Sequence, residues 1–341
     1  MKNSLWYCGV MMLACSCAVQ NNFNPSKKYA AEKLREDFDV FRQVLEETHP
    51  SVYWYTSKDS MNFYFEVAEA KLKDSMSENS FRYVLSYVTS KIKCGHTSVM
   101  PSKAAANYAE RARGFALPFS VKAWPDTVLV TSNLNRRDSL VKRGVILKSI
   151  EGRPVQAMVD SFFSHLSTDG YNTTHKYQQL SNGGSFRNFY AGIYGLKNKM
   201  KVEFIDTAGV LRTAQVAAFN PGADTAARRG RANQPSRKER RAMALQSERN
   251  LRIDTALSTA FMEVNSFAKG KKLRSFFRQS FKKINSSAIK NLVIDMRGNG
   301  GGNVTLSNLL TKYIADAPFK IADSLYAIKR GSRFSKYRSQ Y

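Results

Sequence analysis

The chain contains the stretch Asn291-Leu292-Val293-Ile294-Asp295-Met296-Arg297-Gly298-Asn299-Gly300-Gly301-Gly302. Its apolar first half is typical of a buried strand over 291–295, and residues 304–314 have the pattern of a helix. Upstream, residues 259–267 read as a strand and residues 273–284 as an amphipathic helix. A strand, a helix and an apolar strand in this order predict a βαβ crossover, and therefore a parallel pair of strands.

The glycine cluster lies between the carboxyl end of a strand and the amino end of a helix. Backbone N–H groups can converge in such a loop, and the helix dipole favours negative charge there. Phosphate binding and an oxyanion hole both exploit this arrangement. The P-loop pattern is absent because Asn303 and Val304 follow the glycines, and 298–303 is one residue short of G-x-G-x-x-G. The pattern therefore favours an oxyanion hole.

Residues 24–112 are predicted to form a helical module. One amphipathic helix stops near His49-Pro50, and two more are expected at about 60–73 and 80–93. The module ends in the turn Cys94-Gly95-His96-Thr97. Cys94 stands alone in the body of the chain, so we expect neither a disulfide nor a metal site formed by cysteines.

Residues 113–220 change to a pattern of short strands with one helix. The segment 143–155 resembles the PDZ-domain pattern R-G-D-x-I-L-x-I-N-G-x-P-V, with Val145 and Glu151 in place of the usual aspartate and asparagine. Two alternating runs around a turn at 206–209 predict a hairpin. The stretch 167–199 is an insertion without an assigned place in this pattern.

Residues 221–252 are basic and almost free of large apolar side chains, which predicts a mobile linker or a frayed helix. The whole chain has 53 Lys and Arg against 27 Asp and Glu, a net charge of +26, which favours anionic partners. A polyanion-binding arm and a solvated surface insertion are both open interpretations of the linker. Few aromatic residues are interleaved with the charges, so the pattern does not favour nucleic acid as a partner.

The run from Leu292 to Gly302 is similar to the "hydrophobic-D-L/V-R-x-N-x-G-G" signature of the C-terminal-processing (tail-specific) serine peptidases, which include the tricorn protease core. The resemblance implies an α+β multidomain protein. Its expected parts are an N-terminal helical module, a PDZ-like β-rich domain and a partial peptidase core at 253–341 with a glycine-rich strand-to-helix loop. It also implies protein substrates or carboxyl-terminal peptide tails, and no cofactor or metal.

The resemblance also implies roles for individual residues. His96, in a turn like those of the tricorn-like branch, would be the general base, although it could instead only end a helix. The implied oxyanion donors are the amides of Gly301 with Gly300 or Gly302. The residues implied to support the loop by hydrogen bonds are Asp295, Arg297 and Asn299. The other histidines read as ordinary surface or packing residues, namely His49, His165 and His175.

The chain departs from the family at the nucleophile. The family carries its serine in a later segment like G-x-x-S-A/F-S-A-A/S-E, and its acid or lysine partner lies later still. Residues 303–341 contain no serine with glycine-flanked, small-residue surroundings. The serines of this segment are Ser307, Ser324, Ser332, Ser335 and Ser339. We therefore expect a chain truncated inside its catalytic core and inactive by itself. The alternative is a non-catalytic envelope protein that binds peptides in its PDZ-like groove.

The amino terminus predicts export. An apolar run from Leu5 to Val19 follows Lys2, and its length of about 15 residues is short of the roughly 20 that span a bilayer. Residues 1–20 therefore read as a signal peptide. Cys15 and Cys17 end a sequence that resembles a lipobox, so we expect a lipid anchor in the periplasm or outer membrane of a Gram-negative bacterium. A plainly cleaved signal and an uncleaved anchor are the alternatives.

Overall fold

The computed structural model describes residues 23–112, 114–136, 138–222, 235–287, 289–324 and 331–334. The chain forms two compact units, one of residues 1–224 with 329–341 and the other of residues 225–328. Within the described ranges, no helix is both long and apolar enough to cross a membrane. Helices accompany several sheets that are mostly antiparallel, which agrees with the expected α+β class.

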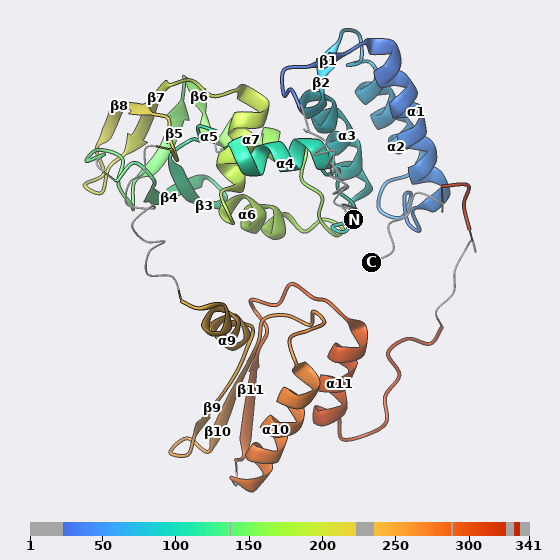
Figure 1. Cartoon of the computed structure of the whole chain (residues 1–341), viewed down its shortest axis with the longest axis vertical. Helices are drawn as coiled ribbons and strands as arrows, with labels where there is room; N and C mark the ends of the chain where they lie inside the picture. The colour runs from blue at the N-terminus through green and yellow to red at the C-terminus, as the bar shows by residue number, and fades with distance from the viewer. Residues whose placement is uncertain are drawn as a thin grey trace, which may run out of the picture. The chain divides into compact units, whose positions relative to one another are not determined.

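The first part of unit 1 is helical (Figure 1). Its elements are β1 (Lys28–Tyr29), α1 (Ala31–Thr48), α2 (Lys58–Glu69), β2 (Met76–Ser77), α3 (Glu78–Ile92) and α4 (Lys103–Ala112). The hydroxyls of Ser57 and Ser77 cap α2 and α3 by accepting backbone amides of the first turn. The first three helices share an apolar core that includes Leu34, Phe38, Met61, Phe65, Val88 and Ile92. Pro50 follows the end of α1, as the sequence predicts.

An antiparallel sheet occupies the rest of unit 1. Its strands are β3 (Phe119–Trp124), β4 (Thr127–Asn133), β5 (Ile146–Ile150), β7 (Lys199–Ile205) and β8 (Leu211–Ala217), hydrogen-bonded in that order, with β6 (Arg153–Pro154) paired to β5. The predicted hairpin is β7 and β8. Three helices complete this part, α5 (Val155–Phe163), α6 (Thr173–Ser181) and α7 (Ser185–Tyr194). The unassigned stretch 167–199 therefore contains α6 and α7, and the likeness to a PDZ domain stays a prediction.

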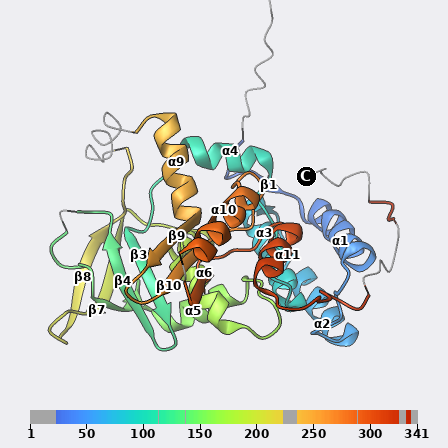
Figure 2. The same cartoon turned by 90° about the horizontal axis from the view of Figure 1, so that it is seen from below.

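Unit 2 contains the predicted βαβ crossover. Its elements are α9 (Arg237–Glu248), β9 (Arg249–Asp254), β10 (Thr259–Val264), α10 (Leu273–Ser286), β11 (Asn291–Asp295) and α11 (Val304–Ile314). β10 and β11 run parallel, with Ala260 opposite Leu292. β9 pairs antiparallel with the other side of β10. α10 lies against the sheet (Figures 1 and 2). Phe277 and Phe281 of this helix belong to the apolar core that it shares with β10.

Two expectations for unit 2 need correction. β11 is not a buried strand, because it lies at the edge of the three-stranded sheet and Val293 is 46% exposed. The basic segment also contains more regular structure than expected. Ser236 and Glu239 form a capping box that starts α9, and β9 begins at Arg249, inside the predicted linker. Residues 223–234 of that linker lie outside the described residues.

Candidate active site

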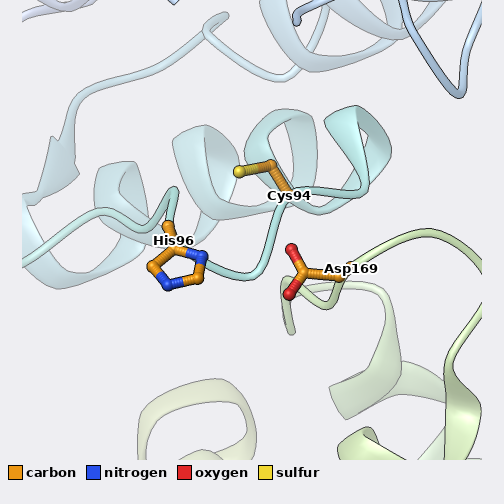
Figure 3. A group of neighbouring side chains, drawn as sticks. All are labelled: Cys94, His96 and Asp169. Carbon is orange, nitrogen blue, oxygen red and sulfur yellow. The ribbon is translucent and has the colours of Figure 1, made fainter. Parts of the chain in front are cut away.

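His96 lies in the turn that follows α3. Lys93 adopts a left-handed conformation, with φ of 59°, and this ends the helix and directs the chain into the turn. Cys94 is half-buried there, whereas His96 is exposed. Figure 3 shows Asp169, from the loop between α5 and α6, facing this turn. The ligand atoms of Cys94, His96 and Asp169 all lie within 4.8 Å of one another.

Two hydrogen bonds fix the loop of Asp169 to the turn of His96. The amide of Gly95 donates to Asp169 Oδ1 at 2.7 Å, and the amide of Gly170 donates to the carbonyl of Lys93 at 2.9 Å. A Cβ at position 95 would lie 3.2 Å from both carboxylate oxygens. Glycine therefore allows the carboxylate to come close to the turn. The position of Asp169 beside the imidazole follows from backbone contacts.

Sequence reasoning missed Asp169 because it lies far from His96 in the chain and within the unassigned stretch. The pair Asp169-Gly170 signals a turn, and nothing in this signal names a spatial partner. The left-handed φ of 58° at Gly170 agrees with that turn. Only the fold brings the carboxylate to the histidine.

His49 also contacts the turn, although the sequence suggested an ordinary histidine. Its Nδ1 accepts the amide of Ser51 at 3.1 Å, which assigns the proton of the neutral ring to Nε2. Nε2 then donates to Thr97 Oγ1 at 2.7 Å. Burial lowers the pKa of His49 below its usual value of 6.5, which favours this neutral form. His49 therefore supports the turn on the side of Thr97.

The two other histidines lie away from this turn. His165 Nδ1 donates to the carbonyl of Tyr83 at 3.0 Å, and burial lowers the pKa of His165 to about 4. His165 and Tyr83 line a cavity of about 930 Å³ in unit 1, and His96 is not among the residues of its wall. His175 is exposed on α6. These positions show one packing histidine and one surface histidine.

The loop after β11 is closed by an ion pair between near neighbours. Asp295 accepts the Arg297 amide at 3.0 Å, and its Oδ2 accepts Arg297 Nη2 at 2.6 Å. These hydrogen bonds from Arg297 lower the pKa of Asp295 to about 2. The Arg297 side chain is 91% exposed. The contacts are of the kind that a supporting role requires, and that role stays a prediction.

Asn299 organises the glycines. Its Nδ2 donates to the carbonyl of Val264 at 2.8 Å, and its Oδ1 accepts the amide of Gly301 at 2.7 Å. The Gly301 amide is therefore engaged inside the loop. Among the described residues, no hydrogen bond from the amides of Gly300 and Gly302 is recorded. Of the predicted oxyanion donors, these two are the ones whose N–H groups are free to bind a ligand.

Gly302 lies against the strand-to-helix segment of the crossover. A Cβ there would lie 2.4 Å from the carbonyl carbon of Phe267, and φ at this position is 140°. The two segments are held together because the Phe267 amide donates to the Gly301 carbonyl and the Asn303 amide donates to the Phe267 carbonyl. Glycine is therefore required at 302 for packing. α11 begins directly afterwards, so the loop lies at a helix amino terminus.

Two of the described serines of the last segment form hydrogen bonds with other groups. Ser307 Oγ donates to the carbonyl of Val304 within α11, and Ser332 contacts Glu47 at 3.4 Å. Ser335 and Ser339 lie outside the described residues, as do the lipidation candidates Cys15 and Cys17. No histidine or carboxylate partner is recorded for Ser307 in the described part of the chain.

The edge of the sheet at β3 is partly covered. α6 lies along this strand, and the amide of Ala123 donates to Ser181 Oγ at 3.0 Å. Lys122 Nζ also contacts Gln178 Oε1. A peptide that added a strand here would compete with Ser181 for an edge amide. The predicted peptide-binding groove stays a prediction, and β8 forms the opposite edge of this sheet.

Comparisons with solved structures find the same fold in CPAF. The structure of mature CPAF complexed with lactacystin has a TM-score of 0.50 and 12% identity, and the match covers 82% of this chain and 59% of that chain. The cpaf s499a mutant gives a TM-score of 0.51 and 14% identity, with 81% and 57% covered. The chain thus spans less than two thirds of the length of these proteins. No curated protein matches the sequence.

A known peptidase family has a sequence pattern that matches the last part of the chain. The pattern of Peptidase family S41 matches residues 258–334, which include β10, α10, β11, the glycine loop and α11. This is the segment from which the resemblance to C-terminal-processing peptidases arose. The resemblance is thereby confirmed, and residues 258–334 carry the sequence pattern of the S41 peptidase family.

Proposed function

We propose that this chain supplies the general base and the oxyanion loop of a serine peptidase that cleaves proteins or peptide tails in the cell envelope. One observation carries the proposal most strongly. The S41 match covers the loop after β11, where the amides of Gly300 and Gly302, at the amino end of α11, have no hydrogen bond to any described residue. Such amides suit a developing negative charge on a carbonyl oxygen.

His96 supports the other half of the chemistry. Its ring is exposed, so a substrate and a nucleophile can reach it, and the carboxylate of Asp169 lies beside it. In the proposed reaction a serine hydroxyl gives its proton to the imidazole while its oxygen bonds to the carbonyl carbon of the substrate. The carbonyl oxygen becomes an oxyanion that Gly300 and Gly302 stabilise. Collapse of the oxyanion then breaks the C–N bond, and the imidazolium gives its proton to the leaving amine. The acyl ester left on the serine is cleaved by water, whose proton passes through the imidazole back to the serine oxygen as the acid product leaves.

Asp169 is held beside the imidazole. The hydrogen bond from Gly95 keeps its carboxylate in place. Within the described residues Asp169 forms no hydrogen bond with His96, although their ligand atoms lie within 4.8 Å of one another. We therefore treat Asp169 as a positioning residue.

We propose that none of the serines after Gly302 is the nucleophile. Ser307 is bonded to its own helix, and the remaining serines after Gly302 lack the glycine-flanked turn of a nucleophile. The chain alone should therefore neither hydrolyse casein nor react with a fluorophosphonate probe. Labelling of Ser307, or of a serine in 324–339, would contradict this part of the proposal.

We further propose that the protein is exported and held at the envelope by acyl chains on Cys15 or Cys17. The support is the apolar segment that ends at these cysteines. Palmitate incorporation into the wild-type chain, lost when both cysteines are replaced by Ala, would agree with this location and lipid attachment. Incorporation that persists in the double variant would contradict it.

A further inference from the structure

The turn after α3 brings together three different metal-binding groups. They are the thiol of Cys94, the imidazole of His96 and the carboxylate of Asp169, and their ligand atoms lie within 4.8 Å of one another. Figure 3 shows one ring nitrogen of His96 toward the carboxylate of Asp169, with Cys94 at the start of the same turn. We propose that these residues bind a thiophilic divalent cation such as Zn²⁺, which blocks the general base. The blocking effect rests on the proposed peptidase function, whereas the binding does not.

The donor set selects the class of metal. Zinc takes sulfur, nitrogen and oxygen ligands together, and sites with three protein ligands leave one position for water. Calcium and magnesium prefer sets made only of oxygen. A thiolate and one carboxylate together also neutralise a doubly charged cation. The cluster therefore fits zinc, or cobalt as its spectroscopic substitute.

The geometry requires only a small adjustment. Zinc bonds of about 2.0–2.3 Å in a tetrahedron place ligand atoms roughly 3–4 Å apart. Donors that lie within 4.8 Å of one another can reach this separation by side-chain rotation. Gly95 contributes because a Cβ there would crowd the carboxylate oxygens at 3.2 Å.

The carboxylate is already held from outside the cluster. Gly95 donates to Asp169 Oδ1, and no partner is recorded for Oδ2 in the described residues. A hydrogen bond to one oxygen of a ligating carboxylate orients the other oxygen toward the metal. The bond between Gly170 and Lys93 fixes the loop itself. Lys93, which directly precedes Cys94, carries a positive charge, and its ammonium lies over the Tyr171 ring, 3.9 Å from the ring centre.

Metal binding would prevent base catalysis by a direct route. Coordination uses the lone pair of an imidazole nitrogen, and cross-linking of His96 to Cys94 and Asp169 holds the ring in one orientation. The Cys94 thiol loses its proton when it binds the metal, so binding releases a proton to solvent. Chelation of the metal would return the ring to its free state. The site would thus act as a metal-dependent inhibitory switch on His96.

Cobalt binding tests the site without any need for activity. The parent for this experiment carries Cys8→Ser, Cys15→Ser and Cys17→Ser, so that Cys94 is its remaining thiol. Co²⁺ should produce a thiolate charge-transfer band that saturates at one equivalent. Cys94→Ser should abolish the band. Asp169→Asn should weaken cobalt binding by at least about tenfold, since loss of a group that only hydrogen-bonds a metal ligand already lowers metal affinity roughly 10–100-fold. His175→Gln should bind like the parent.

The cobalt experiment overturns the proposal if the parent shows no saturable band. A band that survives Cys94→Ser, or an affinity unchanged by Asp169→Asn, would also overturn it. Asn can still accept the Gly95 hydrogen bond, so this variant removes the charge with little disturbance of the loop. A folded far-UV spectrum of each variant separates loss of binding from loss of structure.

Protection of His96 tests the blocking effect. Diethyl pyrocarbonate modifies free imidazole, and the modified positions are read by peptide mass spectrometry. Zn²⁺ should slow the modification of His96 several-fold and leave exposed His175 unaffected. Equal rates at His96 with and without Zn²⁺ would overturn the blocking effect. Because neither readout needs hydrolysis, failure of the peptidase proposal would leave both outcomes unchanged.

Discussion

The amide of Gly95 donates a 2.7 Å hydrogen bond to Oδ1 of Asp169, a residue 74 positions further along the chain. This bond joins the turn after α3 to the loop between α5 and α6. It places a carboxylate beside His96 without using the histidine itself. The environment of the proposed base therefore depends on a contact between two loops.

Replacing Gly95 by Ala should disturb this contact, because the new Cβ would lie 3.2 Å from both oxygens of Asp169. We expect the free energy of unfolding to fall by about 1 kcal/mol, the usual contribution of one hydrogen bond. Gly114→Ala is the matched control, since a Cβ there meets no atom within 4 Å. Urea unfolding measures both variants. Equal midpoints for the two would show that the contact does not matter.

The glycine loop offers a second matched pair. A Cβ at Gly302 would lie 2.4 Å from the Phe267 carbonyl carbon, whereas one at Gly300 meets nothing within 4 Å. Gly302→Ala should therefore destabilise unit 2 by about 1–3 kcal/mol, as overpacking commonly does. Gly300→Ala should fold like the parent. Thermal unfolding compares them, and a stable Gly302→Ala variant would refute the packing argument.

His165 should make the stability of unit 1 depend on pH. Burial holds its pKa at about 4 in the folded state, against 6.5 for the free group. Above pH 6.5 the ring is neutral in both states and contributes nothing. As the pH falls from 6.5 to 4, only the unfolded chain gains the proton, so stability falls by at most roughly 3 kcal/mol.

The variant His165→Asn tests this dependence, because its amide can keep a donor to the Tyr83 carbonyl. Urea unfolding across the same pH range should show a shallower decline than in the parent. His175→Asn, at an exposed position, should keep the full decline. If the free energy of unfolding fell equally with pH in the parent and in the His165→Asn variant, His165 would be excluded as the cause of the decline.

Asp295 should titrate unusually low. The hydrogen bonds from Arg297 lower its pKa to about 2 from 3.8, so the pairing is complete above 3.8 and is lost as pH falls through about 2. Carbon-detected NMR of the carboxyl group measures this directly. Arg297→Gln should raise the pKa toward its ordinary value. A carboxyl that titrates near 3.8 in the parent chain would show that the pair is not formed in solution.

Much of unit 2 could be predicted from periodicity. The order of strand, helix and strand predicted the parallel pairing of β10 with β11, because a helix that connects two strands of one sheet brings the second strand back in the same direction as the first. β9 was missed because Arg249–Asp254 reads as a polar run, and its apolar side chains are only Leu251 and Ile253. Its strand conformation depends on pairing with β10, which no local pattern specifies.

The candidate site was predictable only where a motif carried it. His96 and the glycines are local sequence features, so a resemblance could name them. The engagement of the Gly301 amide by Asn299 and the approach of Asp169 to His96 are three-dimensional contacts. A single sequence gives no information on such pairs when the two residues are far apart in the chain and their spacing follows no helix or strand period. This is why the sequence predicted a base but not the carboxylate beside it.

The central claim is that His96 is the general base of the proposed peptidase. The most direct measurement is fluorophosphonate labelling of the full-length protein, compared with its His96→Gln and His175→Gln variants. We expect His96→Gln to slow labelling of the reactive serine about a thousandfold or more and His175→Gln to leave the rate unchanged. Labelling of Ser307, or full-rate labelling of the His96→Gln variant, would contradict the claim.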